Sequence, residues 1–290
     1  MADAPKTAKP GAKSGGVKPD LATLAGIGLA LAGILGGLIL EKGSIQDVAQ
    51  FTAAMIVLGG TFGAVLVTTP LPVFLRALAG LRDVFLEKSN SASETIETLI
   101  RFATQARKQG IVSLESETGT VPDPFLRKAL NLAVDGTDLN EIRNMMELDI
   151  ELSEQVEEQK AKVWEAAGGY SPTIGIIGAV MGLIQVMKHL DDIKEVGHGI
   201  AVAFVATVYG VATANILFLP SANKLRARMQ QARLLKELTL EGVIGIVEGL
   251  NPTLIRLKLS AFNLAGSPKP AKKDKATAKG AAPQAVPAGD

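Results

Sequence analysis

The sequence predicts an all-α membrane protein with four transmembrane helices and a large helical cytoplasmic domain between the second and the third helix. Three observations support this prediction: four long uncharged apolar segments, a polar block between the second and the third of them, and an uneven distribution of lysine and arginine. The apolar segments are residues 21–40, 48–69, 171–187 and 199–219. Each approaches the roughly 20 residues that a helix needs to cross the hydrocarbon core of a bilayer.

Two other interpretations of these segments are less favoured. Core helices of a soluble domain would rarely be so long and so free of charge at four places in one chain. A cleavable signal peptide at 21–40 would have a shorter apolar region, followed by a small-residue cleavage site.

The composition argues against several functional classes. The chain has no cysteine, so it forms no disulfides or thiolate metal sites, and its net charge of +1 argues against bulk nucleic-acid binding. His189 and His198 lie in one short loop without the spacing of a metal site. The polar block lacks the GxxxxGK[ST] motif of nucleotide hydrolysis. We therefore expect neither an enzyme nor a bound cofactor.

The first 70 residues contain a tail and two spans. Residues 1–20 are rich in alanine, proline, glycine and lysine, and we expect a disordered tail. Residues 21–70 hold transmembrane helices 1 and 2, which the short connection 41–47 should join as a hairpin. Pro70 should end or kink the second helix. Glycines that could form the contact between the two helices are Gly33, Gly37, Gly59 and Gly63.

Residues 71–167 form the predicted cytoplasmic helical domain. Apolar periodicity predicts a helix over 96–109, a second over 125–134 capped by Asp123, and a long third over 141–165 capped by Asp138. The third carries a run of acids that we interpret as a solvated face: Glu147, Asp149, Glu151, Glu154, Glu157 and Glu158.

Residues 168–221 hold transmembrane helices 3 and 4. We expect Pro172 in the first turn of the third, where the missing N–H of proline is not needed. Glycines on this span form a smooth strip on which another helix backbone can pack closely: Gly175, Gly178 and Gly182.

Residues 222–265 form a predicted cytoplasmic C-terminal helical region, and 266–290 a disordered tail. The helix expected over 222–242 carries basic residues close enough to the bilayer to meet anionic headgroups. Apolar residues after it should pack against the cytoplasmic domain: Ile244, Val247, Leu250, Leu254 and Leu257.

Lysine and arginine indicate the orientation. Of 30 in the chain, 4 lie in the N-terminal tail, 11 in residues 71–167 and 12 after Pro220, whereas the connections 41–47 and 188–198 hold only 3 together. Because cytoplasmic segments carry the excess of positive charge, both termini and the large domain should be cytoplasmic.

The four spans contain no carboxylate. A protein that moves protons or sodium ions needs a titratable or coordinating group near the membrane midplane, so here that carboxylate must come from a partner helix. Each hydroxyl or amide in the spans, taken alone, is interpreted as bonding its own helix or a neighbour: Thr61, Thr173, Gln185, Thr207, Tyr209, Thr213 and Asn215.

The order of these parts resembles the MotA family of flagellar motor stator proteins, which is related to TolQ and ExbB. The most specific segments are GGYSPTIGIIGAVMGLIQVM (168–187) and GIAVAFVATVYGVATANILFLPSANKL (199–225), and the resemblance covers roughly residues 21–259. It implies a homo-oligomeric ring, a pentamer, around a MotB-type single-span subunit whose aspartate carries the ion. The glycine strip of 171–187 would then be a wall facing that second protein. The implied location is the bacterial inner membrane, and the implied function is flagellar motility.

The resemblance also implies roles for individual residues. In ARKQGIVSLE, Arg107 and Glu115 take the places of the charges that engage the rotor protein FliG. Pro172 and Pro220 match two prolines at the membrane edge that couple ion passage to movement. Thr207 matches the hydroxyl facing the partner's aspartate, and Tyr209 lies beside it in the same span.

The same comparison favours protons over sodium as the transported ion. Sodium-type members usually carry threonine where this chain has Ala179 and Ala206. Fewer oxygens leave less to coordinate a dehydrated cation.

Two alternatives stay open from sequence. One is a TolQ/ExbB-type proton-driven energiser of outer-membrane processes, against which the usual three-span plan of those proteins argues. The other is a non-conducting membrane scaffold whose glycine strips serve only assembly.

Overall fold

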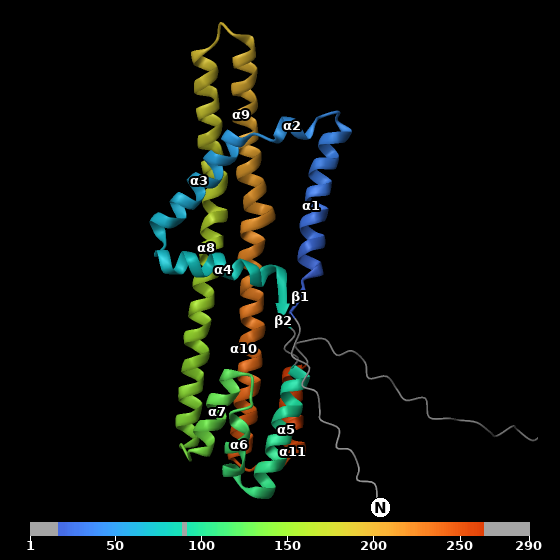
Figure 1. Cartoon of the computed structure of the whole chain (residues 1–290), viewed down its shortest axis with the longest axis vertical. Helices are drawn as coiled ribbons and strands as arrows, with labels where there is room; N and C mark the ends of the chain where they lie inside the picture. Colours follow the sequence, from blue (N-terminus) through green and yellow to red (C-terminus); the bar gives the residue numbers. More distant parts are fainter. Residues whose placement is uncertain (1–16, 89–91, 264–290) are drawn as a thin grey trace, which may run out of the picture.

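The computed structural model describes residues 17–88 and 92–263. Two long helical rods lie side by side along the length of the molecule (Figure 1). One rod is α8 (Leu139–Lys188). The other consists of α9 (Ile193–Ala212), the π-helical segment η2 (Thr213–Phe218) and α10 (Leu219–Val247). One end of each rod is apolar and the other is polar, so the rods connect a membrane-spanning half to a polar half made of residues 71–167 and 222–263.

The four predicted spans are present in the described chain. The helices long and apolar enough to cross a membrane are Leu21–Leu40, Ile45–Thr68, Leu139–Lys188 and Ile193–Val247. The predicted architecture of four spans, with a large helical segment between the second and third, is thereby confirmed.

The prediction that Pro172 opens the third span is wrong. Pro172 lies inside α8, which runs unbroken from its N-cap Asp138 to Lys188. Proline removes one hydrogen bond from a helix interior, yet the packing of α8 along α9 and α10 on both sides of this position keeps the helix continuous.

The first two spans do not form a glycine-packed hairpin. α1 (Leu21–Leu40) has no buried residue and stands apart from the rods, and the short helix α2 (Ile45–Val48) links it to α3 (Phe51–Thr68) (Figure 1). A Cβ added at any of the four glycines expected to form the contact would meet nothing within 4 Å: Gly33, Gly37, Gly59 and Gly63.

The end of the expected N-terminal tail is structured. Residues 1–16 lie outside the described residues, but β1 (Val17–Pro19) pairs antiparallel with β2 (Leu86–Lys88), and Asp20 caps α1 by accepting a hydrogen bond from Thr23. Backbone pairing with β2 therefore overrides the disorder expected for residues 17–20. The tail expected over 266–290 lies outside the described residues.

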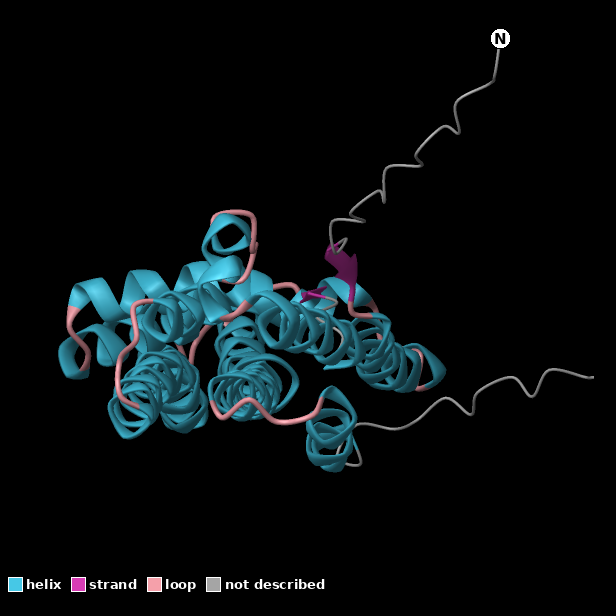
Figure 2. Ribbon diagram, turned by 90° about the horizontal axis from the view of Figure 1, so that it is seen from below, coloured by secondary structure: helices cyan, strands magenta, loops and turns pink. Residues whose placement is uncertain are grey.

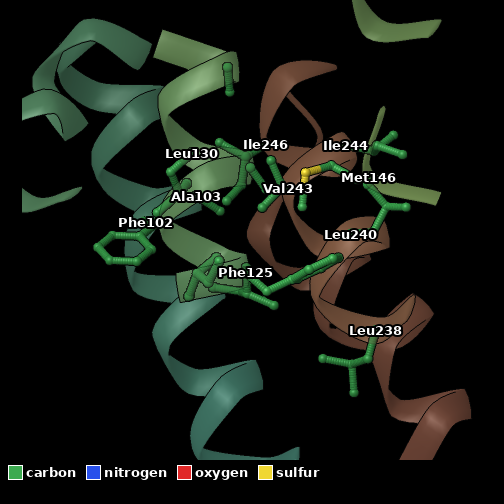
Figure 3. Close-up of a cluster of buried hydrophobic side chains, with 14 of the residues drawn as sticks. Phe102, Ala103, Phe125, Leu130, Met146, Leu238, Leu240, Val243, Ile244 and Ile246 are labelled. Carbon is green, nitrogen blue, oxygen red and sulfur yellow. The ribbon is translucent and has the colours of Figure 1, made fainter. Parts of the chain in front are cut away.

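The polar half has its own core (Figure 3). It contains α5 (Ala92–Gln109), the 3-10 turn η1 (Ile111–Leu114), α6 (Glu115–Thr118), α7 (Pro124–Val134) and α11 (Pro252–Asn263), packed on α8 and α10. As predicted, Asp123 caps α7 and Asp138 caps α8. α4 (Leu71–Phe85) crosses the rods between the two halves (Figure 1). In the part of the chain that the structure describes, Figure 2 shows helices throughout and, in magenta, the short strands β1 and β2.

The acidic run on α8 is not a purely solvated face. Glu158 and Glu165 bind Arg226 of α10 at 2.9 and 2.6 Å, and Glu154 binds Arg233 at 2.6 Å. The basic residues of α10, which the sequence predicts to lie near lipid headgroups, also form ion pairs within the chain. These residues are Lys224, Arg226, Arg228, Arg233 and Lys236.

The face of α11 that packs on the core differs from the expected one. Ile255 and Leu259 are buried, whereas Leu254 and Leu257 are 49% and 69% exposed. α11 carries apolar residues on both faces, so the sequence alone did not distinguish the packed face from the free one.

Candidate functional site

The third and fourth spans meet backbone to backbone along a row of glycines and alanines. A Cβ at Gly175 would lie 2.9 Å from the carbonyl oxygen of Ala206, and a Cβ at Gly182 would lie 2.8 Å from both the backbone nitrogen of Ala203 and the carbonyl oxygen of Gly199. No side chain fits at either position, because the neighbouring atoms belong to the opposing backbone. This small-residue packing is typical of helix pairs within membranes.

The glycine strip therefore does not face a second protein. Gly175, Gly178 and Gly182 are all buried against α9 of the same chain. The surface that α8 leaves open in its spanning half is instead apolar and branched, as at Ile177, Met181 and Ile184, which are about half exposed.

At the level where the two halves meet, both rods depart from regular α-helix. Pro172 interrupts the hydrogen bonding of α8, and the facing rod widens into the π-helical segment η2 before Pro220, with the Leu219 N–H donating to the Ala214 carbonyl. π-helical turns occur frequently at functional sites. A Cβ at Gly210 would lie 2.7 Å from the Ser171 carbonyl oxygen and 3.3 Å from Cα of Pro172, so the rods touch here.

A hydrogen bond joins the rods at this level. The hydroxyl oxygens of Ser171 and Thr213 are 2.8 Å apart, and the Thr213 hydroxyl also lies 2.7 Å from the Tyr209 carbonyl. Since a carbonyl only accepts, Thr213 donates to Tyr209 and Ser171 donates to Thr213. From sequence, Thr213 is expected only to bond its own helix or a neighbour, and no sequence feature singles out Ser171.

The two polar side chains predicted for the ion path have different surroundings. Thr207 is half-buried and donates to the Ala203 carbonyl of its own helix at 3.3 Å. Tyr209 reaches the connection before α3, where its hydroxyl donates to the Val48 carbonyl at 2.5 Å and accepts from the Gln50 N–H at 3.3 Å. The Tyr209 hydroxyl thus fixes the start of the second span to the fourth.

The two alanines used to infer the ion also differ. Ala179 is half-buried, whereas Ala206 is completely buried and would contact a Cβ at Gly178 at 2.8 Å. A larger residue at 206 would therefore meet α8 of the same chain rather than an open surface.

Two buried side-chain atoms of the second span have no hydrogen-bond partner among the described residues: the side-chain oxygen of Gln50, just before α3, and the hydroxyl of Thr61. Thr61 of α3 is fully buried. Buried hydroxyls normally find a partner, so the Thr61 hydroxyl is a candidate for a bound water.

In the polar half, three helix ends converge near Arg107. Residues with left-handed backbone conformations follow α5, α7 and α10, and two of them, Gly136 and Gly249, line a cavity of about 380 Å³ together with Arg107. Glu115 begins α6 and is exposed. Within the described chain neither Arg107 nor Glu115 forms an ion pair, so both charges are free to meet a partner.

The predicted site residues therefore fall into two groups. Pro172, Pro220, Thr207, Ala179, Ala206 and Tyr209 lie on the rods in or beside the spanning half, and Arg107 and Glu115 lie in the polar half. The rods connect these groups, and ion pairs stiffen the connection. In one such cluster, Arg226 of α10 lies between Glu158 and Glu165 of α8: the hydrogen bond to Arg226 lowers the pKa of the Glu165 carboxyl, and the hydrogen bonds to both carboxylates raise the pKa of Arg226.

Sequence comparisons agree with this arrangement. Residues 117–237 match the MotA/TolQ/ExbB proton channel family, and residues 24–110 match the motility protein A N-terminal family. Motility protein A of Helicobacter pylori is 36% identical over 250 residues, which cover 86% of this chain and 97% of that protein. Chemotaxis protein PomA of Vibrio alginolyticus is 33% identical over 236 residues, which cover 81% and 92% of the two chains.

Solved structures show the same fold. A chain in the structure of C. jejuni MotAB has a TM-score of 0.80 and 35% identity, covering 84% of this chain and 95% of that chain. A chain in the flagellar MotAB stator complex from Bacillus subtilis has a TM-score of 0.77 and 34% identity, covering 83% and 95%. The chain therefore belongs to the motility protein A branch of the MotA/TolQ/ExbB proton channel family.

Proposed function

We propose that this chain is the A subunit of a flagellar motor stator, which forms an ion channel with a MotB-type subunit and converts ion-motive force into torque on the rotor. The observation that carries the proposal is the lack of any carboxylate in the four spanning segments of a chain with this fold. An ion carrier in the membrane needs such a group, so it must come from the partner helix.

Several copies of the chain surround the partner in this proposal, and five copies form the ring. The proposal is supported by the two MotAB structures that share the fold, and by the apolar surface that α1 and the open side of α8 leave uncovered. Helices that expose an apolar surface on every side need lipid or further protein around them.

Thr207, Pro172 and Pro220 form the coupling region. Passage of the ion on and off the partner's aspartate changes the contacts of that helix near Thr207. The change reaches the polar half through the level of Pro172, η2 and Pro220, where both rods have lost regular hydrogen bonding. Such irregular turns bend at lower cost than regular helix.

The transported ion is the proton. Ala179 and Ala206 offer no side-chain oxygen, and the three threonines of the third and fourth spans, Thr173, Thr207 and Thr213, donate to backbone carbonyls. Sodium would need several oxygen ligands in place of its hydration shell, whereas a proton needs only the carboxylate.

Arg107 and Glu115 engage the rotor protein FliG through charge. Their exposure and their lack of partners among the described residues support this role. The polar half is then cytoplasmic, as are both termini, and the membrane is the bacterial inner membrane. The positive charge of residues 71–167 and of the chain after Pro220 supports this orientation.

Ion flux tests the proposal. Co-expression with a MotB-type single-span subunit, in cells loaded with a pH indicator, should give proton flux that disappears when the partner's membrane aspartate is changed to asparagine. No flux with any such partner would favour a non-conducting scaffold. The TolQ/ExbB-type energiser is not favoured, because the relatives of this chain are motility proteins.

A further inference from the structure

An exposed apolar stripe runs along the polar half of α8. It consists of Met145, Leu148, Leu152 and Val156, whose spacing of three and four residues places them on one side of the helix; they are 45%, 54%, 52% and 38% exposed. These residues precede the spanning segment, so lipid does not cover them. An apolar patch in contact with water marks a protein interface.

The stripe is not used within the chain. A different side of the same segment buries Ile142, Met146 and Ile150 in the core of the polar half. Ion pairs such as Glu154 with Arg233 hold that side to α10. The stripe therefore faces away from the contacts of α8 within its own chain.

A second apolar face lies on α11. Leu254 and Leu257 are exposed there, while Ile255 and Leu259 hold the helix to the core. In Figure 1 the lower part of α8 lies at one flank of the polar half and α11 lies at the other.

The two faces lie at the same level of the molecule. Glu241 of α10 binds Arg143 of α8 at 2.8 Å and Lys258 of α11 at 2.5 Å. Arg143 stands just before Met145, and Lys258 just after Leu257. Two copies set side by side would thus bring the stripe of one to the height of α11 in the next.

The charges beside the two faces are opposite. The exposed charged residues next to the stripe are Glu147 and Glu151, and residues 144–156 contain no lysine or arginine. α11 carries no acid, and its two bases, Arg256 and Lys258, are about half exposed although each pairs with one acid of its own chain, Glu97 and Glu241. Opposite charges around apolar centres favour one partner and one register.

We propose that the stripe on α8 of one copy packs against the Leu254–Leu257 face of α11 in the neighbouring copy. Because the two surfaces differ, the contact between neighbouring copies is head-to-tail. Repeating it closes a ring when the rotation that relates one copy to the next is a whole fraction of a full turn. The inference rests on the proposed function only in requiring several copies of the chain.

Thiol cross-linking tests this contact directly, since the chain has no cysteine of its own. Full-length protein carrying Leu148→Cys and Leu257→Cys, co-expressed with a MotB-type subunit in membranes, should give a ladder of multimers with a flexible bis-maleimide. The matched control carries Leu148→Cys and Val112→Cys, because Val112 is 63% exposed on η1, outside both faces. The control should give no ladder, and equal ladders from both pairs, or none from either, would overturn the proposed contact.

A second measurement removes the stripe. Leu148→Glu with Leu152→Glu changes only exposed positions, so the chain should fold and the multimer seen in size-exclusion chromatography with light scattering should be lost. Val112→Glu should leave the multimer unchanged. If Leu148→Glu with Leu152→Glu stays multimeric, the proposed contact is wrong, but the proposed ring of several copies is not contradicted. If the wild-type protein contains one copy of the chain when its partner is present, both the proposed ring and the proposed contact are wrong.

Discussion

The hydroxyl of Ser171 donates to the hydroxyl of Thr213 at 2.8 Å, at the level where α8 contains Pro172 and the facing rod becomes a π-helix. Thr213 donates in turn to the Tyr209 carbonyl. These two hydrogen bonds link the rods at the level where Pro172 and the π-helical segment interrupt the regular backbone hydrogen bonding of each rod.

The order of donors predicts unequal effects of two conservative substitutions. In Ser171→Ala, the Thr213 hydroxyl still donates its hydrogen bond to the Tyr209 carbonyl. In Thr213→Val, the buried Ser171 hydroxyl loses the oxygen to which it donates. We expect Thr213→Val to destabilise the protein more, by about 0.6 kcal/mol and at most about 1.7 kcal/mol. Thermal unfolding in detergent of both single variants and of the double variant measures the difference. A larger loss for Ser171→Ala would show that the donor order is reversed.

The packing of glycine against backbone predicts a strong effect at Gly182. A Cβ there would lie 2.8 Å from two backbone atoms of α9, so Gly182→Ala must separate the helices, at a cost of about 1–3 kcal/mol. Gly169→Ala is the matched control, because a Cβ at Gly169 in the same helix would meet nothing within 4 Å. The control should be neutral or slightly stabilising, since alanine favours helix. Equal melting temperatures for the two variants would contradict the packing described above.

The sequence predicted elements whose signals are local and missed contacts that depend on distant residues. Spans 21–40 and 171–187 follow from length and lack of charge, and the caps at Asp123 and Asp138 follow from the residues after them. The partners of the acidic run could not be predicted, because Glu154 and Arg233 lie 79 residues apart in the sequence and meet only after the chain has reversed between α8 and α9. The continuity of α8 through Pro172 depends on the packing of the facing rod.

The candidate site was predicted only in outline. The sequence predicts that Thr207 and the glycines lie on the fourth and third spans. It does not predict that the glycine face of α8 packs against α9 of the same chain, because that contact depends on the three-dimensional arrangement. The role of Asp20 was missed altogether, because its partners Lys224 and Arg228 lie about 200 residues away.

Asp20 should hold the start of the first span through charge. Its carboxylate accepts from Lys224 at 2.6 Å and from Arg228 at 2.8 Å, and these contacts, with the capping bond from Thr23, keep the pKa of Asp20 well below its usual range. A lowered folded-state pKa contributes stability that is fully present above the unfolded pKa of about 4, and this contribution decreases progressively as pH falls from that value towards the much lower folded pKa. We expect Asp20→Asn to cost about 1–3 kcal/mol at pH 7, and progressively less in acid.

The control for this prediction is Asp138→Asn. Asp138 also caps a helix, yet it forms no ion pair with another described residue, and asparagine is an equally good cap. The difference in unfolding temperature between Asp20→Asn and wild type should stay constant from pH 7 to about pH 5 and begin to narrow, without closing, by about pH 3, while Asp138→Asn follows wild type throughout. A pH-independent gap for Asp20→Asn would show that the ion pairs contribute nothing.

Tyr209 should act as an anchor of the second span. Tyr209→Phe would leave the Val48 carbonyl and the Gln50 N–H without their shared partner, and we expect a loss of about 1–3 kcal/mol in stability. The ion preference of the flux should not change, because the hydroxyl is occupied by backbone. A switch from proton to sodium dependence in this variant would instead place Tyr209 in the ion path.

Charge reversal at Arg107 and Glu115 tests the contact with the rotor. Both residues are exposed and have no charged partner in the described chain, so Arg107→Glu and Glu115→Lys should fold normally. Each should weaken rotor binding and torque, and the wild-type interaction should weaken as salt rises, because exposed charge pairs are screened. Lys128→Glu is the control, since Lys128 is an exposed base that already pairs with Asp149. Pull-down with FliG and tethered-cell rotation report the two effects. Unchanged binding and torque in both reversals would show that the rotor contacts another surface of the polar half.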